Sequence, residues 1–257
     1  TTVRTGLPGT AWRKLNYGVQ PSKSTTKQVD DTCGMLEAYA EVDKNLADLN
    51  GNTSAFRLSE DRAFLEAMNQ KMADTLFYGD TSKNPERFLG LAPRFSTLTL
   101  ASAASAENVV NGGASSGTSN SSIWLVGWGQ NSVHGIYPKG SKAGFQHKDL
   151  GEVTLTDAAG GRYQGYRTHY QWDIGLCVRD WRYVVRICNI PKTIGTTNLI
   201  DLMVEASELL PSLNGVRPAF YMNRTMRTNL RKQLANKSNV NLSIDEAAGK
   251  KVLAFDE

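Results

Sequence analysis

Three cysteines are the side chains of this sequence best suited to nucleophilic or metal chemistry. They cannot all pair within one chain, and their spacing matches no zinc site. Asp173 and Asp180 lie close to Cys177, so a cytosolic hydrolase that uses Cys177 or a histidine is one alternative. Cys177 falls in a predicted strand, however, and we expect buried, reduced thiols in a protein that folds in a cytosol, at Cys33, Cys177 and Cys188.

The histidines and one glycine-rich loop give no firmer indication of catalysis. His134, His147 and His169 are not spaced to form a metal site with other ligand residues. Residues 112–119 resemble a phosphate-binding loop, but Thr118 stands where that loop requires lysine. We therefore expect no catalytic residue, no metal ligand and no cofactor, and a protein that is not an enzyme.

One further segment has a composition suited to nucleic acid. Trp181–Arg186 mixes aromatic and arginine side chains. Together these can stack on the bases and neutralise the phosphates of single-stranded nucleic acid. A half-buried strand whose arginines face water or a neighbouring molecule explains the same pattern. The net charge of +4 is too weak to decide for nucleic acid, so a nucleic-acid-binding module is a second alternative.

Charge is divided unevenly along the chain. It has 257 residues, of which 40% are hydrophobic, enough for one large domain or two small ones. No apolar run approaches the roughly 18 residues of a transmembrane helix, and residues 1–10 do not resemble a signal peptide. Residues 1–29 carry five basic side chains and no acidic one, whereas residues 30–80 carry eleven acidic and four basic. Such opposite segments favour association in a defined register.

The first segment is predicted to form a hairpin that needs a partner. Thr1–Thr5 is predicted to be a strand, Leu7–Gly9 a turn, and Trp12–Val19 the returning strand. An isolated two-stranded hairpin is only marginally stable in water. A polar hairpin with a few large apolar side chains therefore points to contact with another subunit.

The remaining elements alternate between helix and strand patterns. Apolar residues recur at helical spacing from Ser59 to Tyr78, where Gly79 ends the helix. Residues 101–120 are predicted to be an exposed loop. The stretch 122–190 is rich in strand patterns that indicate an antiparallel sheet. Two helices (199–210, 223–237) and two short strands (219–222, 252–255) follow, and because both ends fall in strands we expect the natural polypeptide to extend further.

Several of these residues resemble the major capsid proteins of tailed bacteriophages with the Hong Kong 97-type fold. Residues 61–91 read DRAFLEAMNQKMADTLFYGDTSKNPERFLGL, which is similar to the family's long spine helix and the turn after it. VHGIYPKGS and GLCVRDWRYVVRICNI look like one branch of the family. Asn223–Arg224 resembles the family's Asn-Pro turn between a strand and a helix, with arginine replacing proline.

The resemblance implies an α+β, Hong Kong 97-like fold with an E-loop hairpin, a P domain built from a spine helix and an antiparallel sheet, and an A domain. The sheet segment precedes the A-domain helices here, as in the rearranged branch found in short-tailed phages. The implied domains are the E-loop at 1–32, the P domain at 33–100 with its spine helix at 59–78, the exposed loop and P-domain sheet at 101–190, and an incomplete A domain at 191–257.

The function implied is structural: a major capsid protein that assembles as hexamers and pentamers into an icosahedral shell around double-stranded DNA, in the virion, after folding in the host bacterial cytoplasm. Expected partners are further copies, packaged DNA contacted without sequence preference, and a decoration protein, scaffold and portal, with no membrane. The E-loop is expected to contact a neighbour through opposite charges and aromatic side chains, namely Arg4, Trp12, Arg13, Lys14, Tyr17 and Lys23 on the hairpin, and Glu60, Asp61, Glu66 and Asp74 on the acidic segment.

Overall fold

The computed structural model of this chain describes residues 1–49, 51, 53–115, 117, 119–192, 197–236, 242–247 and 250–255. The chain divides into two compact units, each made of two segments. The first unit is Thr1–Ser96 with Val133–Asp180, and the second unit is Thr97–Ser132 with Trp181–Glu257. No helix among the described residues is long and apolar enough to cross a membrane.

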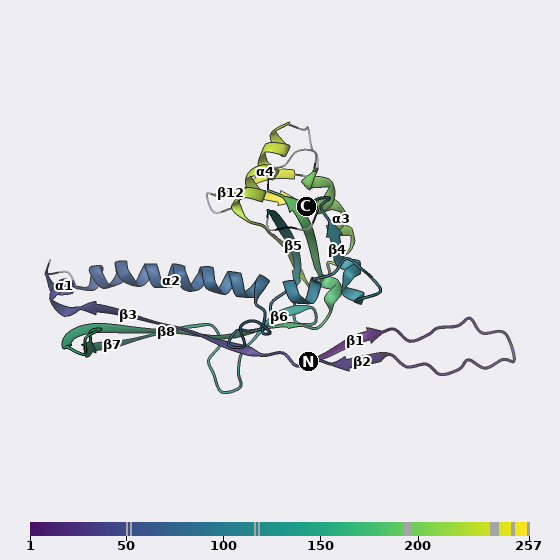
Figure 1. Cartoon of the computed structure of the whole chain (residues 1–257). Coiled ribbons are helices and arrows are strands. Elements are labelled where there is room, and N and C mark those ends of the chain that lie inside the picture. The colour runs from purple at the N-terminus through teal and green to yellow at the C-terminus, as the bar shows by residue number, and fades with distance from the viewer. Residues whose placement is uncertain are drawn as a thin grey trace. The chain divides into compact units, whose positions relative to one another are not determined.

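The first unit begins with a long hairpin, which we call the ribbon (residues 1–32). β1 (Thr2–Gly6) pairs antiparallel with β2 (Thr25–Gln28), and both arms continue to a distant tip (Figure 1). The expected turn at 7–9 and returning strand at 12–19 are wrong, because the chain reverses at residues 14–17. There the Tyr17 amide donates to the Lys14 carbonyl at 3.3 Å, and Asn16 adopts a φ of 64°, a conformation that asparagine tolerates.

A twisted antiparallel sheet forms the body of the first unit. Its longest strand, β8 (Arg162–Val178), pairs with β3 (Cys33–Asp43) along one edge, from Cys33 opposite Gly175 to Asp43 opposite Gly165. Along its other edge β8 pairs with β7 (Phe145–Thr156) and β6 (Val133–Ile136). This arrangement agrees with the predicted antiparallel pairing of these segments.

A long helix, α2 (Thr53–Tyr78), lies along this sheet after the short helix α1 (Lys44–Asp48) (Figure 1). Met68 is buried against Ala40 of β3 and Tyr170 of β8. The helix ends where the sequence predicted but begins six residues earlier, at Thr53 rather than Ser59. The first turns are held by Arg57, which bonds to Asp149 at 2.6 Å and lies over the Tyr166 ring.

Two glycines close the end of α2. The Gly90 amide donates to the Gly79 carbonyl at 2.9 Å, and the Leu91 amide to the Leu76 carbonyl at 3.1 Å. A β-carbon on Gly90 would lie 2.6 Å from the Thr75 carbonyl oxygen and 2.8 Å from the Gly79 nitrogen. The loop can therefore fold back onto the helix end only because this position lacks a side chain.

The second unit has a group of paired strands covered by two helices. β9 (Val184–Pro191) pairs with β5 (Asn120–Trp128) on one side and in parallel with β4 (Val109–Asn111) on the other. β5 also pairs with β10 (Arg217–Tyr221). The sheet and helices share one apolar cluster, to which the strands contribute Val110, Ile123, Leu125, Val185, Ile187 and Ile190, and the helices α3 (Leu199–Glu208) and α4 (Arg224–Asn236) contribute Leu199, Ile200, Met203, Ala206, Met226 and Leu230.

Two expectations for the second unit need correction. The predicted exposed loop at 101–120 contains a 3-10 helix (Ala104–Asn108) and the strand β4. Asn108 is buried and donates to the carbonyls of Arg182 and Val184 at 2.9 and 3.0 Å, which fixes this small-residue segment in the core. The strand predicted from Trp181 begins only at Val184, after a short 3-10 turn. A final hairpin pairs β11 (Leu242–Ala247) with β12 (Lys250–Phe255), the second of which was predicted.

We expect Gly90→Ala to lower the free energy of unfolding by about 1–3 kcal/mol, because the added methyl group would overlap backbone atoms that cannot move aside. Chemical denaturation of the isolated chain measures the effect. Gly18→Ala is the matched control, since a β-carbon there meets no atom within 4 Å and the stability should not change. Equal stabilities of the two variants would contradict the packing described at the helix end.

Candidate subunit-contact site

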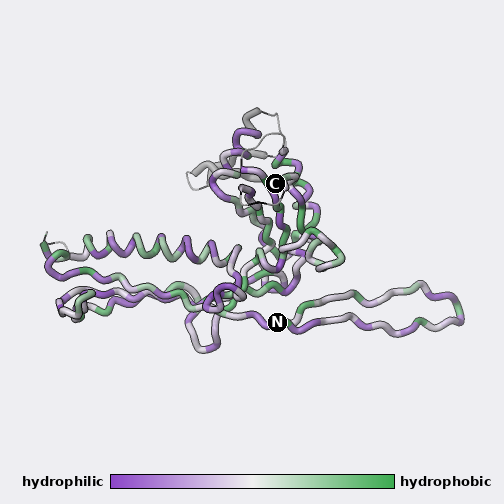
Figure 2. The backbone as a smooth tube through the Cα atoms, viewed as in Figure 1, coloured by the Kyte–Doolittle hydropathy of each residue, from purple (hydrophilic) through white to green (hydrophobic). Residues whose placement is uncertain are grey.

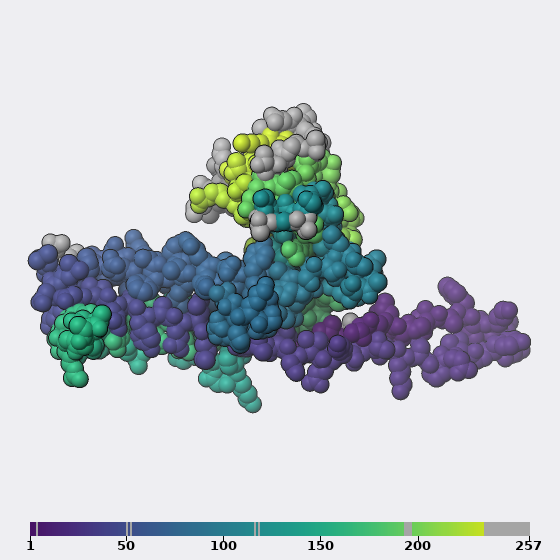
Figure 3. Space-filling view, viewed as in Figure 1, coloured from purple at the N-terminus to yellow at the C-terminus, as the bar shows by residue number. Residues whose placement is uncertain are grey.

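The ribbon exposes large apolar side chains that no other described part of the chain covers. The exposed fractions are 103% for Trp12, 86% for Leu15 and 69% for Tyr17. Short hydrophobic stretches lie among hydrophilic and neutral residues along the ribbon (Figure 2), and the ribbon stands clear of the body of the first unit (Figure 3). Exposed apolar surface of this kind is typical of a site that another protein covers.

The arms of the ribbon beyond β1 and β2 are held together loosely. In residues 7–24, all of which the structure describes, the only hydrogen bonds are the turn at the tip and one from the Ser22 hydroxyl to the Gly9 carbonyl, at 2.6 Å. Arg13, Lys14 and Lys23 are exposed and form no ion pair with any described residue. The side chain of Arg4 lies outside the described part. The ribbon thus presents positive charge and unpaired backbone groups to its surroundings.

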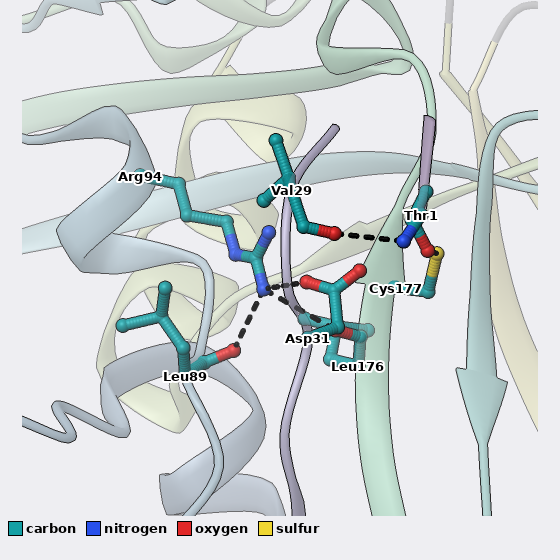
Figure 4. Close-up of polar contacts among 7 residues, drawn as sticks. All are labelled: Thr1, Val29, Asp31, Leu89, Arg94, Leu176 and Cys177. Carbon is teal, nitrogen blue, oxygen red and sulfur yellow. Dashed lines mark hydrogen bonds and ion pairs between the residues drawn. The ribbon is translucent and has the colours of Figure 1, made fainter. Parts of the chain in front are cut away.

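The base of the ribbon, in contrast, is fixed by a buried ion pair (Figure 4). The Arg94 guanidinium lies 2.8 Å from the Asp31 carboxylate, and the side chain of Asp31 is only 3% exposed. The same guanidinium nitrogen donates to the carbonyls of Leu176, at 3.2 Å, and Leu89, at 3.4 Å. One arginine therefore joins the returning arm of the ribbon to β8 and to the loop after α2.

The outgoing arm is fixed beside it. Thr1 and Val29 exchange backbone hydrogen bonds, both 2.7 Å long. The Thr1 hydroxyl lies 3.1 Å from the buried Cys177 sulfur of β8 (Figure 4). Both arms are therefore bonded to the first unit at the base of the ribbon. The sequence did not point to Arg94 or Asp31, since they lie 63 residues apart and neither belongs to a motif.

The four acidic residues expected to receive a ribbon all lie on α2, but the helix does not gather them on one face. Asp61 is half-buried and hydrogen-bonded to Tyr170. Burial of Tyr170, together with this hydrogen bond, raises the pKa of Tyr170 above the usual value. Glu66 accepts from Gln70 at 2.8 Å, and Asp74 lies 3.5 Å from Arg87. Glu60 is exposed. Which of them meets a neighbour stays a prediction.

A groove lies between α2 and β3 near the end of the helix. Its volume is about 220 Å³. Cavities of about 150 Å³ hold a benzene-sized molecule, so the groove can admit one aromatic side chain. Its lining combines apolar and charged residues, among them Met35, Leu36, Lys71, Met72, Glu86 and Phe88.

The residues considered for catalysis are used in packing. Cys177 and Cys188 are buried, and burial raises the pKa of both thiols above the usual value. His169 stacks on Tyr39 and lies 3.3 Å from Glu37. The described residues contain no group of three or more His, Cys, Asp or Glu that could hold a metal ion.

The glycine-rich loop at residues 112–119 also lacks the helix that a catalytic serine motif requires after it. Residues 113–117 match the Gly-x-Ser-x-Gly pattern of a nucleophile elbow, which requires a helix directly after it. Strand β5 follows instead, from Asn120. Ser116 and Thr118 lie outside the described residues. In the aromatic and arginine segment, Arg186 lies over the Trp124 ring at 5.1 Å, which agrees with a half-buried strand.

Comparison with known proteins identifies the class. A family model described as major capsid protein GP7 matches residues 1–257. The chain is also similar to a chain in the cryo-EM structure of bacteriophage epsilon15, with 42% identity and a TM-score of 0.63, over 98% of this chain and 77% of that one. No curated protein matches. Ribbon, fold and comparisons together define a tailed-phage shell protein.

The chain belongs to the major capsid protein GP7 family. Its α+β, Hong Kong 97-like fold, expected from the sequence, is confirmed. It is a structural protein of the phage capsid. Copies of it assemble into the shell, and it is located in the virion. The alternatives of a hydrolase and a nucleic-acid-binding module find no support in either comparison.

We expect Arg94→Met to destabilise the first unit by about 3 kcal/mol, because Asp31 would remain buried without its partner. Hydrogen exchange should then accelerate at residues 29–33. Arg87→Met is the matched control: its pair with Asp74 is 3.5 Å long and Asp74 is 55% exposed, so the expected loss is about 0–1 kcal/mol. Unchanged exchange at the ribbon base in Arg94→Met would show that the pair does not hold the ribbon.

The buried thiols should react slowly. At pH 8, we expect Cys177 and Cys188 to be alkylated at least tenfold more slowly in the folded chain than in urea, because burial disfavours the thiolate. Mass spectrometry of the labelled peptides measures both sites. Rapid labelling of Cys177 in the folded chain would restore the cysteine-hydrolase alternative.

Proposed function

We propose that copies of this chain form hexamers and pentamers of a closed icosahedral shell that encloses double-stranded DNA. In this proposal the ribbon of each copy lies across the helix and sheet of its neighbour. The observation that carries it is the ribbon itself: its base is fixed by the buried Arg94–Asp31 pair, while Trp12, Leu15 and Tyr17 beyond it are exposed. A fixed direction combined with uncovered apolar side chains suits a contact with another copy.

Charge supports the same pairing. All charged side chains in the segment 1–29 are basic. The segment 30–80, which supplies α2 and β3, has a large excess of acidic side chains. Individual exposed pairs contribute only about 0–1 kcal/mol, so aromatic contacts must supply most of the binding. The groove beside α2 can admit one such side chain.

The two units support an assignment of domains. We propose that the ribbon is the E-loop, that the rest of the first unit is the P domain with α2 as its spine, and that the second unit is the A domain. The segment 101–190, expected as one block, is shared between the units, with Val133–Asp180 in the first. Support comes from the separate cores of the units.

The finer expectations belong to the same proposal. The chain has a structural rather than an enzymatic role, folds and assembles in the host bacterial cytoplasm, and contacts DNA without reading its sequence. Scaffold, portal and decoration proteins are its further partners. Burial of the thiols, with their raised pKa, supports the non-enzymatic role.

We expect the double variant Trp12→Ser, Tyr17→Ser to fold as the parent chain does but to yield at least tenfold fewer closed particles, since both side chains are exposed in the single copy. Sedimentation velocity and negative-stain electron microscopy measure particle yield. Trp12→Phe with Tyr17→Phe keeps aromatic contacts and should assemble. Normal shells from the serine variant would refute the role of the ribbon.

A further inference from the structure

Helix α3 of the second unit carries an acidic stripe on its exposed face. The stripe consists of Asp201, Glu205 and Glu208, which are separated by four and three residues and therefore lie on one side of the helix. All three are exposed, while the opposite side of α3 is buried in the apolar cluster. We call these three residues the acidic stripe.

Helix α4 carries a basic stripe of the same length. Arg224, Arg227 and Arg231 are exposed at spacings of three and four residues, and Met226 and Leu230 of the same helix are buried. No acidic residue occurs between Arg224 and Asn236. Seven residues separate the ends of each stripe, so each extends over about 10 Å at about 1.5 Å per residue.

Neither stripe is neutralised by the part of the chain that the structure describes. Among the described residues, none of the six forms an ion pair. The two helices are joined by hydrogen bonds at one end: the Gln233 side chain, late in α4, accepts from the Leu199 amide and donates to the Thr197 carbonyl at the start of α3. In Figure 1, α3 and α4 lie toward different sides of the second unit.

The positions of these charges are unfavourable in a single copy. Glu208 is the last residue of α3, where the helix dipole disfavours a negative charge. Arg224 is the first residue of α4, where the dipole disfavours a positive charge. Like charges along one helix face also repel one another. A surface of opposite sign on another molecule would offset all three effects.

We propose that the acidic stripe of one copy binds the basic stripe of the next copy. The two stripes match in sign, number and length, and they belong to different helices of the same unit. A contact between two different surfaces of identical subunits continues from copy to copy, and it closes into a ring when the rotation from one copy to the next divides a full turn. This inference rests on the proposed function, since it assigns the contact between second units around each hexamer and pentamer.

A charge-swap experiment tests the contact in the full chain. The first variant reverses the acidic stripe (Asp201→Lys, Glu205→Lys, Glu208→Lys), and the second reverses the basic stripe (Arg224→Glu, Arg227→Glu, Arg231→Glu). Each alone should yield at least tenfold fewer closed particles at low salt, because like charges then face each other. All six substitutions in one chain should restore the yield. Lys232→Glu, on α4 but outside the stripe, is the matched control and should assemble normally.

Mixing the two single-stripe variants adds a geometric readout. One variant has two basic stripes and the other two acidic stripes, so they can alternate around a ring of six but not around a ring of five. The mixture should therefore form hexamers, seen by native mass spectrometry, without closed shells.

Two outcomes would overturn the inference. They are normal assembly of either single-stripe variant, and no rescue in a variant with all six substitutions whose circular dichroism shows a folded chain. Normal shells with poor DNA packaging from the variant with the reversed basic stripe would assign the arginines to DNA. If shells still depend on Trp12 and Tyr17 in these cases, only the stripe contact fails and the proposed function stands.

Discussion

The buried ion pair between Arg94 and Asp31 is the interaction on which the ribbon depends. The side chain of Asp31 is 3% exposed, and the guanidinium 2.8 Å away offsets the cost of burying its charge. That guanidinium also donates to two carbonyl oxygens, one on β8 and one after α2. The pair therefore fixes the ribbon relative to both layers of the first unit. Without a fixed base, a hairpin whose arms are joined by so few hydrogen bonds would sample many directions.

The first unit is thin, and this explains why it leaves so much for a neighbour to cover. One helix lies on one sheet, and an apolar cluster between them is formed by Ala40, Met68 and Tyr170 with a few half-buried side chains. Met35 and Leu58 remain largely exposed. An elongated two-layer body buries less apolar surface than a compact domain of equal length. In a shell, such a body gains burial from the copies around it.

Charge and apolar surface have different tasks in this chain. Exposed ion pairs contribute little free energy each but discriminate between registers, because a displaced register places like charges together. The aromatic side chains of the ribbon can supply binding energy without specifying position. A shell protein needs both, since each contact is repeated in many copies and an error in one ring would prevent closure.

The sequence by itself was enough to predict the helices and strands that have strong local patterns, and to predict the family. The end of α2 at Tyr78, the helix α3 and most strands follow from periodicity, capping and glycine, which act within a few residues. The resemblance carried by residues 61–91 led to the capsid fold. The turn at 7–9 and the strand at 12–19 were predicted wrongly, because Pro8–Gly9 suits an extended arm as well as a turn, and the chain reverses at Asn16 instead.

Only the tertiary structure decided the rest. The early start of α2 depends on Arg57 reaching Asp149, and the burial of Asn108 depends on carbonyl oxygens more than seventy residues away. The acidic residues of α2 looked like one patch in the sequence but point in different directions, because each residue turns the helix by about 100°. Arg94 and Asp31 had no pattern to connect them. Contacts between residues distant in sequence depend on the whole fold, and local patterns do not contain them.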